Sequence, residues 1–253
     1  MPGPAGVGTL RPVDPILLLH PFPLDARVWD PLRARLSAEA QLVDPHLPGW
    51  GGTALPDADP SLDAVAEHVL RVLDGRGLDR VTAVGAALGG FVLMALLRRA
   101  PERVAAAVFT GTQAIADPDR ALATRAMVIR RATEEGTGWL ADFMLPQLLT
   151  AEDPALRRVI DEQSPRTVAW YAAAMAARPD SRPLLRALDL DALVVHGAED
   201  PIMGAPVAEE LAELTGAPLH FVEGAAHLPA YEQPDRFLDV VLPWLRARPA
   251  AAT

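Results

Sequence analysis

Short apolar runs alternate along this chain with longer segments in which apolar residues recur every three or four positions. Such runs, bounded by Gly, Pro or Asp, are typical of buried strands. Strands are predicted at residues 16–19, 41–43, 81–84, 104–110, 193–196 and 219–222. Because helical patterns separate these runs, the sequence predicts an α/β fold with a mostly parallel central sheet flanked by helices.

Two helices have a clear apolar face in the sequence. One runs from about residue 61 to 74, and Ser61 is a natural N-cap for it. The other begins at Pro234, a good first-turn residue. Their predicted buried faces comprise Leu62, Val65, Ala66, Val69 and Leu73 in the first, and Phe237, Leu238, Val241, Leu242 and Leu245 in the second.

More than eighty residues separate the strands at 104–110 and 193–196, which is far longer than an ordinary connection. This stretch must therefore be an insertion with its own structure. Helices are predicted within it at residues 119–135, 138–149, 154–163 and 166–177. We expect one discontinuous core domain, residues 1–112 and 181–253, with the insertion at residues 113–180.

Composition narrows the class of protein. The chain has 253 residues, half of them hydrophobic, which is enough for one large core. No apolar run approaches the length of a membrane span, and no signal-peptide pattern is present, so a cytoplasmic location is expected. The absence of cysteine excludes disulfides and thiolate chemistry. A net charge of −10 makes nucleic acid or an anionic membrane a poor candidate partner.

The most informative local pattern is Gly85-Ala86-Ala87-Leu88-Gly89-Gly90, between a predicted strand and an apolar helix. A Gly-rich turn at this position is the setting of the G-x-S-x-G nucleophile elbow. The glycines are needed because the residue at the apex is held in a strained conformation with its neighbours packed closely. Here the apex residue is Ala87, which has no nucleophilic atom.

Two later strands end in residues that suit acid–base chemistry. Asp200 follows the strand at 193–196, and His227 follows the strand at 219–222. The chain order is therefore elbow, acid, histidine, which is the order in the α/β-hydrolases. The chain resembles a small α/β-hydrolase of the esterase, lactonase and enol-lactonase type. The segments 44–52 and 224–234 are also similar to family turns, although His46 stands where Asp is usual.

The resemblance implies a role for each site residue. Residue 87 is the nucleophile position, His227 the general base and Asp200 the group that orients it. The segment His20-Pro21-Phe22-Pro23 resembles the family's oxyanion segment, so the backbone N–H groups of Phe22 and Leu88 would form the oxyanion hole. No metal or other cofactor is implied.

The resemblance also implies that the insertion is a helical cap over the elbow. Among its large side chains, those expected to line a substrate pocket are Trp139, Phe143, Trp170 and Tyr171. The substrate class would be a small carboxylic ester or lactone. We expect a monomer or a homodimer.

Three interpretations of Ala87 are open at this point. Alanine can replace a natural serine, which would silence a hydrolase. It can be natural in an enzyme that uses His227 and Asp200 for non-hydrolytic acid–base chemistry, such as a lyase, cyclase or isomerase. The third interpretation is a ligand-binding pseudoenzyme. The apparent acid, base and oxyanion segment argue against the third, because a binding protein needs none of them.

Overall fold

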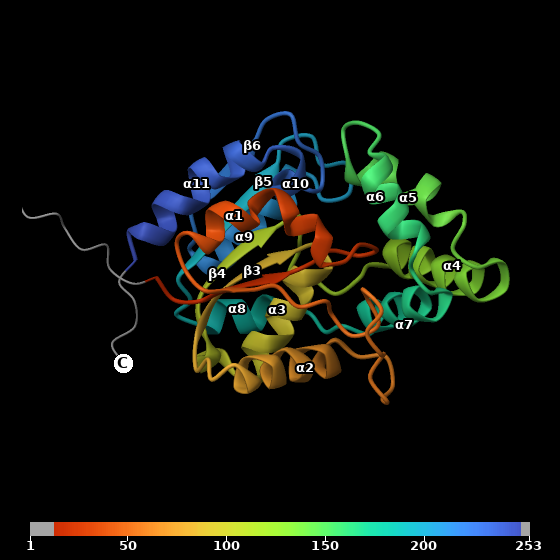
Figure 1. The fold of residues 1–253 in the computed structure, drawn as a ribbon, viewed down its shortest axis with the longest axis horizontal. Coiled ribbons are helices and arrows are strands. Elements are labelled where there is room, and N and C mark those ends of the chain that lie inside the picture. Colours follow the sequence, from red (N-terminus) through yellow and green to blue (C-terminus); the bar gives the residue numbers. More distant parts are fainter. Residues whose placement is uncertain (1–12, 249–253) are drawn as a thin grey trace, which may run out of the picture.

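The computed structural model describes residues 13–248, so the ends of the predicted core at residues 1–12 and 249–253 lie outside the described residues. The described chain forms a six-stranded sheet in the order β2-β1-β3-β4-β5-β6, and all neighbouring strands are parallel (Figure 1). The strands are β1 (Ile16–Leu19), β2 (Leu42–Val43), β3 (Val81–Ala86), β4 (Val104–Thr110), β5 (Ala192–Gly197) and β6 (Leu219–Val222). The predicted α/β fold is confirmed.

Helices cover both faces of this sheet. Figure 1 shows α2 (Leu62–Gly75) and α3 (Leu88–Arg99) on one face, and α1 (Asp30–Ser37) and α11 (Pro234–Arg246) on the other. The remaining core helices are α8 (Arg182–Ala187), α9 (Ala205–Thr215) and α10 (Pro229–Glu232), and the short 3₁₀ turns are η1 (Ala26–Trp29) and η2 (Pro101–Arg103). The layered arrangement buries β3, β4 and β5 along their whole length.

The two helices with a clear apolar face in the sequence have that face buried. All five predicted residues of α2 and all five of α11 are buried. The Ser61 side chain accepts a hydrogen bond from the N–H of Asp63, which caps α2 as predicted. Helix α3, in contrast, is buried from Leu88 to Leu97 without a polar face, because it lies in the centre of the molecule against β1, β3, β4 and α2.

Four helices between β4 and α8 form a group at one end of the sheet, and they are called the cap helices below (Figure 1). They are α4 (Asp119–Glu135), α5 (Leu140–Leu148), α6 (Pro154–Asp161) and α7 (Pro165–Ala176). Each matches a helix predicted from the sequence, with ends that differ by at most two residues. Helix α4 packs on α7, and α5 packs on α6. None of the helices within residues 13–248 has the length and apolar character needed to cross a membrane.

Candidate active site

The turn between β3 and α3 has the backbone geometry of an elbow. Ala87 has φ 47° and ψ −109°, and it alone among the described non-glycine residues has a positive φ. Its N–H donates to the carbonyl oxygen of Thr110 (2.9 Å), and its own carbonyl accepts from the Thr112 hydroxyl (3.0 Å). These two hydrogen bonds hold residue 87 in a strained conformation, which costs about 1–3 kcal/mol at such a position.

Glycines beside Ala87 allow the elbow to pack closely. A Cβ atom added at Gly89 would lie 1.9 Å from the carbonyl oxygen of Leu19, in the neighbouring strand β1. A Cβ atom at Gly85 would lie 2.7 Å from the carbonyl oxygen of Gly89. Side chains at either position would therefore push the elbow away from the sheet.

Asp200 and His227 form a buried hydrogen-bonded pair. The Nδ1 atom of His227 lies 2.8 Å from Oδ2 of Asp200. The other oxygen, Oδ1, accepts hydrogen bonds from the backbone N–H groups of Ile202 (2.8 Å) and Met203 (3.0 Å). Burial alone would raise the pKa of Asp200, but the His227 ring and these donors bring that pKa below its ordinary value. Asp200 is therefore a carboxylate at neutral pH, oriented toward His227.

A second histidine contacts the same carboxylate. His196, at the end of β5, is buried, and its Nε2 lies 2.5 Å from the carbonyl oxygen of Met203 and 3.3 Å from Oδ2 of Asp200. Burial lowers the pKa of His196, so its ring is neutral at pH 7. A neutral ring with its proton on Nε2 can donate toward Met203 and Asp200 together. The sequence indicates His196 only as part of a strand.

The elbow and the imidazole lie on either side of the end of β4. Thr110 accepts the hydrogen bond from Ala87, and a Cβ atom at the next residue, Gly111, would lie 3.2 Å from Cε1 of His227. Gly111 has φ +54°, so a side chain there would be strained as well as crowded. At the end of β5, a Cβ atom at Gly197 would lie 1.7 Å from the carbonyl oxygen of Ala226. Both glycines make room for the loop that carries His227.

The segment after β1 is held by a buried histidine. Nε2 of His20 accepts from the N–H of Leu47 (3.0 Å), and Nδ1 lies 3.3 Å from the carbonyl oxygen of Pro21. Burial lowers the pKa of His20 to about 4, so the ring is neutral. Phe22, two residues later, is buried edge-on against Trp50, with ring centroids 5.8 Å apart.

The backbone N–H groups of Phe22 and Leu88 are available as hydrogen-bond donors. In the part of the chain that the structure describes, the N–H of Phe22 donates no hydrogen bond. Leu88 is the first residue of α3, so its N–H has no acceptor within the helix. An N–H at a helix N-terminus favours a negatively charged acceptor.

The four aromatic residues expected to line a pocket have different environments. Phe143 lines a hollow of about 340 Å³ between α4, α5 and residues 201–203. Trp139 packs on Phe143 and under the guanidinium of Arg131. Trp170 lines a separate hollow between α4 and α7 and donates to the carbonyl of Ala58 (3.2 Å).

Tyr171, the fourth of these residues, is fully buried. Its hydroxyl donates to the carbonyl oxygen of Pro48 (2.9 Å), and its ring packs against Trp50. These contacts join a cap helix to the core. Of the four aromatic residues, Phe143 is the one that lines the hollow beside the Asp200 loop.

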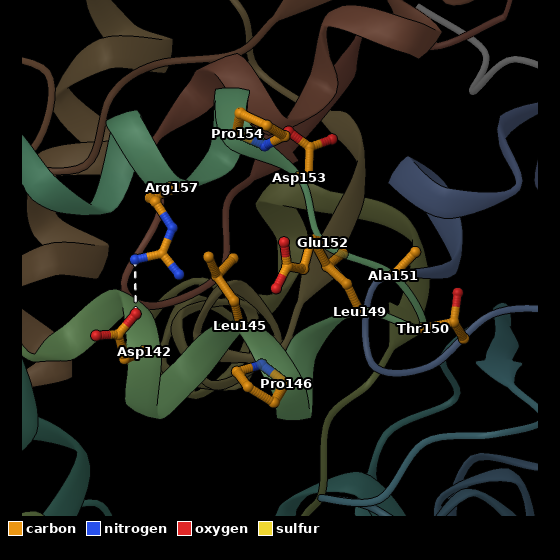
Figure 2. A pocket seen from close by; sticks show the side chains of 10 residues that line it. All are labelled: Asp142, Leu145, Pro146, Leu149, Thr150, Ala151, Glu152, Asp153, Pro154 and Arg157. Carbon is orange, nitrogen blue, oxygen red and sulfur yellow. Dashed lines mark hydrogen bonds and ion pairs between the residues drawn. The ribbon is translucent and has the colours of Figure 1, made fainter.

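Another hollow, of about 460 Å³, lies on the cap between α5 and α6 (Figure 2). Figure 2 shows Asp142 and Arg157 facing each other, and they form an ion pair at 2.7 Å. Asp153 caps α6 through the N–H groups of residues 155 and 156. All of its lining residues lie within 142–157, whereas Met203 of the Asp200 loop lines the hollow beside Phe143, so this hollow is a weaker candidate for the site.

Glu232 is a site residue whose role only the structure reveals. Its Oε1 accepts from the N–H (2.6 Å) and hydroxyl (2.8 Å) of Thr150, and its Oε2 accepts from the N–H of Ala226 (2.8 Å). It therefore links the His227 loop to the loop between α5 and α6. The Glu-x-Pro pattern at residues 232–234 was the signal for it in the sequence. Within residues 13–248, no group of three or more His, Cys, Asp or Glu residues is arranged to hold a metal ion.

The chain is similar to known proteins over most of its length. The model of the alpha/beta hydrolase family matches residues 16–240. The chain is 32% identical over 248 residues to a pimeloyl-[acyl-carrier protein] methyl ester esterase of Aromatoleum aromaticum, covering 87% of this chain and 93% of that protein.

Solved structures are similar to the whole described fold. A thermophilic esterase from Thermogutta terrifontis, solved with malate bound, aligns with a TM-score of 0.88 and 31% identity over 93% of this chain and 90% of that one. The enol-lactonase from Burkholderia xenovorans aligns with a TM-score of 0.82 and 25% identity, over 92% and 91% of the two chains. With its parallel sheet, its elbow and the family model matched over most of its length, this chain belongs to the alpha/beta hydrolase family.

Proposed function

We propose that this site is built to hydrolyse a small carboxylic ester or lactone by a Ser/His/Asp mechanism, and that Ala87 leaves the chain without the nucleophile. One observation carries the proposal. Ala87 keeps the strained elbow conformation (φ 47°), and the Asp200–His227 pair is intact at 2.8 Å. The names of the similar proteins, two esterases and an enol-lactonase, support the same substrate class.

The contacts support a role for each of these residues. With serine at residue 87, its Oγ would attack the carbonyl carbon while His227 takes the hydroxyl proton through Nε2. The same proton would then pass to the leaving alkoxide as the acyl-enzyme forms, and water would release the acid by the same steps. Asp200 would keep the His227 proton on Nδ1, and the N–H groups of Phe22 and Leu88 would stabilise the oxyanion. No cofactor takes part.

We extend the proposal to the domains. Residues 1–112 and 181–253 would form the hydrolase core, and residues 113–180 the cap, with Phe143 on the substrate side. Trp139 would support Phe143, while Trp170 and Tyr171 would hold the cap on the core.

A second candidate function is non-hydrolytic acid–base chemistry at His227. The intact Asp200–His227 pair favours it, because a general base can act on a bound substrate without any covalent intermediate. A ligand-binding pseudoenzyme is supported less well, because binding alone needs no such pair.

The test is Ala87→Ser. Both forms are assayed against a panel of short activated esters and lactones, and both are treated with a fluorophosphonate and weighed by intact mass spectrometry. We expect the serine variant to hydrolyse members of the panel and to gain one adduct, and the alanine form to gain none. Triad hydrolases that lose their nucleophile keep roughly 10³ to 10⁴-fold catalysis over water, so slow turnover alone is not decisive.

A matched control tests whether the hydroxyl added at residue 87 acts through Asp200 and His227. Asp200→Asn in the Ala87→Ser background should abolish both labelling and turnover, because the His227 tautomer is no longer held. Were Ala87→Ser to bring neither label nor turnover, acyl transfer would be ruled out, and proton abstraction by His227 would become the leading function.

A further inference from the structure

The hollow lined by Phe143 adjoins the candidate site along its walls. Gln113 lines it and follows Thr112, whose hydroxyl donates to the carbonyl of Ala87. Met203 lines it as well, and its N–H donates to Asp200. Helix α5, which supplies Phe143, ends at Leu148, whose carbonyl accepts from the N–H of His227 (3.2 Å). A ligand in the hollow would therefore lie beside the elbow, acid and base.

The polar side of the hollow carries excess positive charge. Asp117 is buried there and pairs with two guanidinium groups, with Arg125 at 3.0 Å and with Arg178 at 2.6 Å. Two positive charges thus surround one negative charge. Arg125 uses only Nε in that pair, and its two terminal nitrogens donate to no other described residue. Arg120 also lines the hollow and adds a further positive charge.

Gln113 supplies an unpartnered polar group to the same hollow. It is 8% exposed, and its carboxamide makes no hydrogen bond with any of residues 13–248. The carboxamide atoms are accessible to solvent, so a ligand acceptor in the hollow can take the place of water on the amide N–H. A carboxylate accepts from amides and guanidinium groups alike.

Apart from Thr124 and Gln147, the rest of the lining of the hollow is apolar. Phe143, Met144 and Met203 line it, and the rim residue Ile202 is 37% exposed. An occupant that suits both sides has an anionic end and a short hydrocarbon body. A charge alone would leave the apolar residues in contact with water, and a neutral ester would offer the terminal nitrogens of Arg125 no anionic acceptor.

We propose that this hollow binds the non-reacting carboxylate of the substrate, with Arg125 and Gln113 as the anion contacts. The substrate class is then an ester or lactone with a free carboxylate at its far end. This inference rests on the proposed function for the reacting end, and its binding test does not depend on turnover.

The test measures binding to the chain as it stands, since without a nucleophile at residue 87 it forms no acyl-enzyme. Monomethyl adipate and dimethyl adipate have the same length and differ by one negative charge. By isothermal titration we expect the monoester to bind about tenfold more tightly or better, as a charge-assisted pair predicts. Arg125→Gln should remove that difference. Arg130→Gln is the matched control, because Arg130 lies on the same helix, is exposed and does not line the hollow.

Equal binding of the two esters, absence of binding, or an unchanged preference in a folded Arg125→Gln variant would overturn the carboxylate site. Should Arg125→Gln fail to fold because Asp117 loses a partner, Gln113→Leu tests the same site without touching an ion pair. Its expected effect is a loss of about threefold or more in monoester affinity.

The two proposals fail in different ways. If Ala87→Ser hydrolyses neutral and anionic esters equally well, the carboxylate site is wrong and the hydrolase function stands. If the monoester binds with dependence on Arg125 and Ala87→Ser never turns it over, the hydrolase function is wrong and the carboxylate site stands.

Discussion

At the scale of single residues, the conformation of Ala87 does not depend on its side chain. Hydrogen bonds to Thr110 and from Thr112, together with the close packing at Gly89, hold the turn. An alanine at the apex is therefore compatible with a complete elbow. For this reason Ala87→Ser is expected to restore an oriented hydroxyl without rebuilding the backbone.

Buried His20 gives a prediction about pH. It is neutral in the fold with a pKa of about 4, whereas an unfolded chain has the ordinary value of 6.5. Between these values the unfolded state binds more protons, so stability falls as pH drops from 6.5 toward 4. The full contribution of this residue is about 3 kcal/mol. Urea unfolding at about pH 7 and about pH 4.5 should show the loss.

The substitution His20→Gln tests the source of that loss. Glutamine offers an oxygen that can accept from the N–H of Leu47, and it does not titrate. The variant should lose clearly less stability between the two pH values than the parent. The control is His220→Gln at an exposed position on β6. An equal loss in the parent and in His20→Gln would show that His20 is not the group responsible.

At the scale of elements, the short helix α10 holds the His227 loop against the cap. Its last residue, Glu232, accepts from Thr150 through one oxygen and from Ala226 through the other. Tyr231, in the same helix, donates to Asp153 at the start of α6 (2.8 Å). The position of His227 therefore depends on the cap helices as well as on the sheet.

Glu232→Gln should loosen this link. The substitution turns one carboxylate oxygen into an NH₂ group, which cannot accept from the N–H of Thr150 or of Ala226, so one charge-assisted bond of about 1.5–3 kcal/mol is lost. In the Ala87→Ser background we expect kcat to fall about three- to tenfold with little change in KM. Faster hydrogen exchange at the Ala226 amide would report the loosening independently of activity.

Glu223→Gln is the matched control, since Glu223 precedes the same loop and its side chain is exposed. Unchanged exchange at Ala226 in Glu232→Gln would show that the Glu232 contacts do not hold the loop.

At the scale of the whole molecule, contacts between cap and core are spread over several elements. The Tyr171 hydroxyl binds Pro48, the Thr167 hydroxyl donates to the carbonyl of Gly49 (3.0 Å), and Arg27 pairs with Glu162 (2.6 Å). These residues lie more than a hundred positions apart in the chain. We therefore expect the cap and the core to unfold together.

Tyr171→Phe tests this coupling. The substitution leaves the buried carbonyl of Pro48 without its donor, which should cost about 1–3 kcal/mol. Thermal unfolding followed by near-UV and far-UV circular dichroism should still give one coincident transition at a lower Tm. Tyr231→Phe, at a partly buried tyrosine, should cost less. Two separate transitions in the parent would contradict the coupling of cap and core.

Much of the fold was predictable because its signals are local. The apolar runs of β1, β4 and β6 and the apolar faces of α2 and α11 follow from side-chain periodicity alone. The cap helices were predictable for the same reason, with small errors at their ends because helix termini depend on capping and neighbours. The order of elbow, acid and histidine also lies in the sequence.

The partners of those residues depend on contacts between distant parts of the chain. Periodicity carries no information on the second histidine at Asp200, the link through Glu232, or the separate environments of Phe143 and Tyr171. The sequence by itself determined the elements, their order and the residue types available for chemistry, because these follow from local pattern. Only the tertiary structure decided which side chains meet, which polar groups stay unpaired and where the hollow opens, because packing sets each of them.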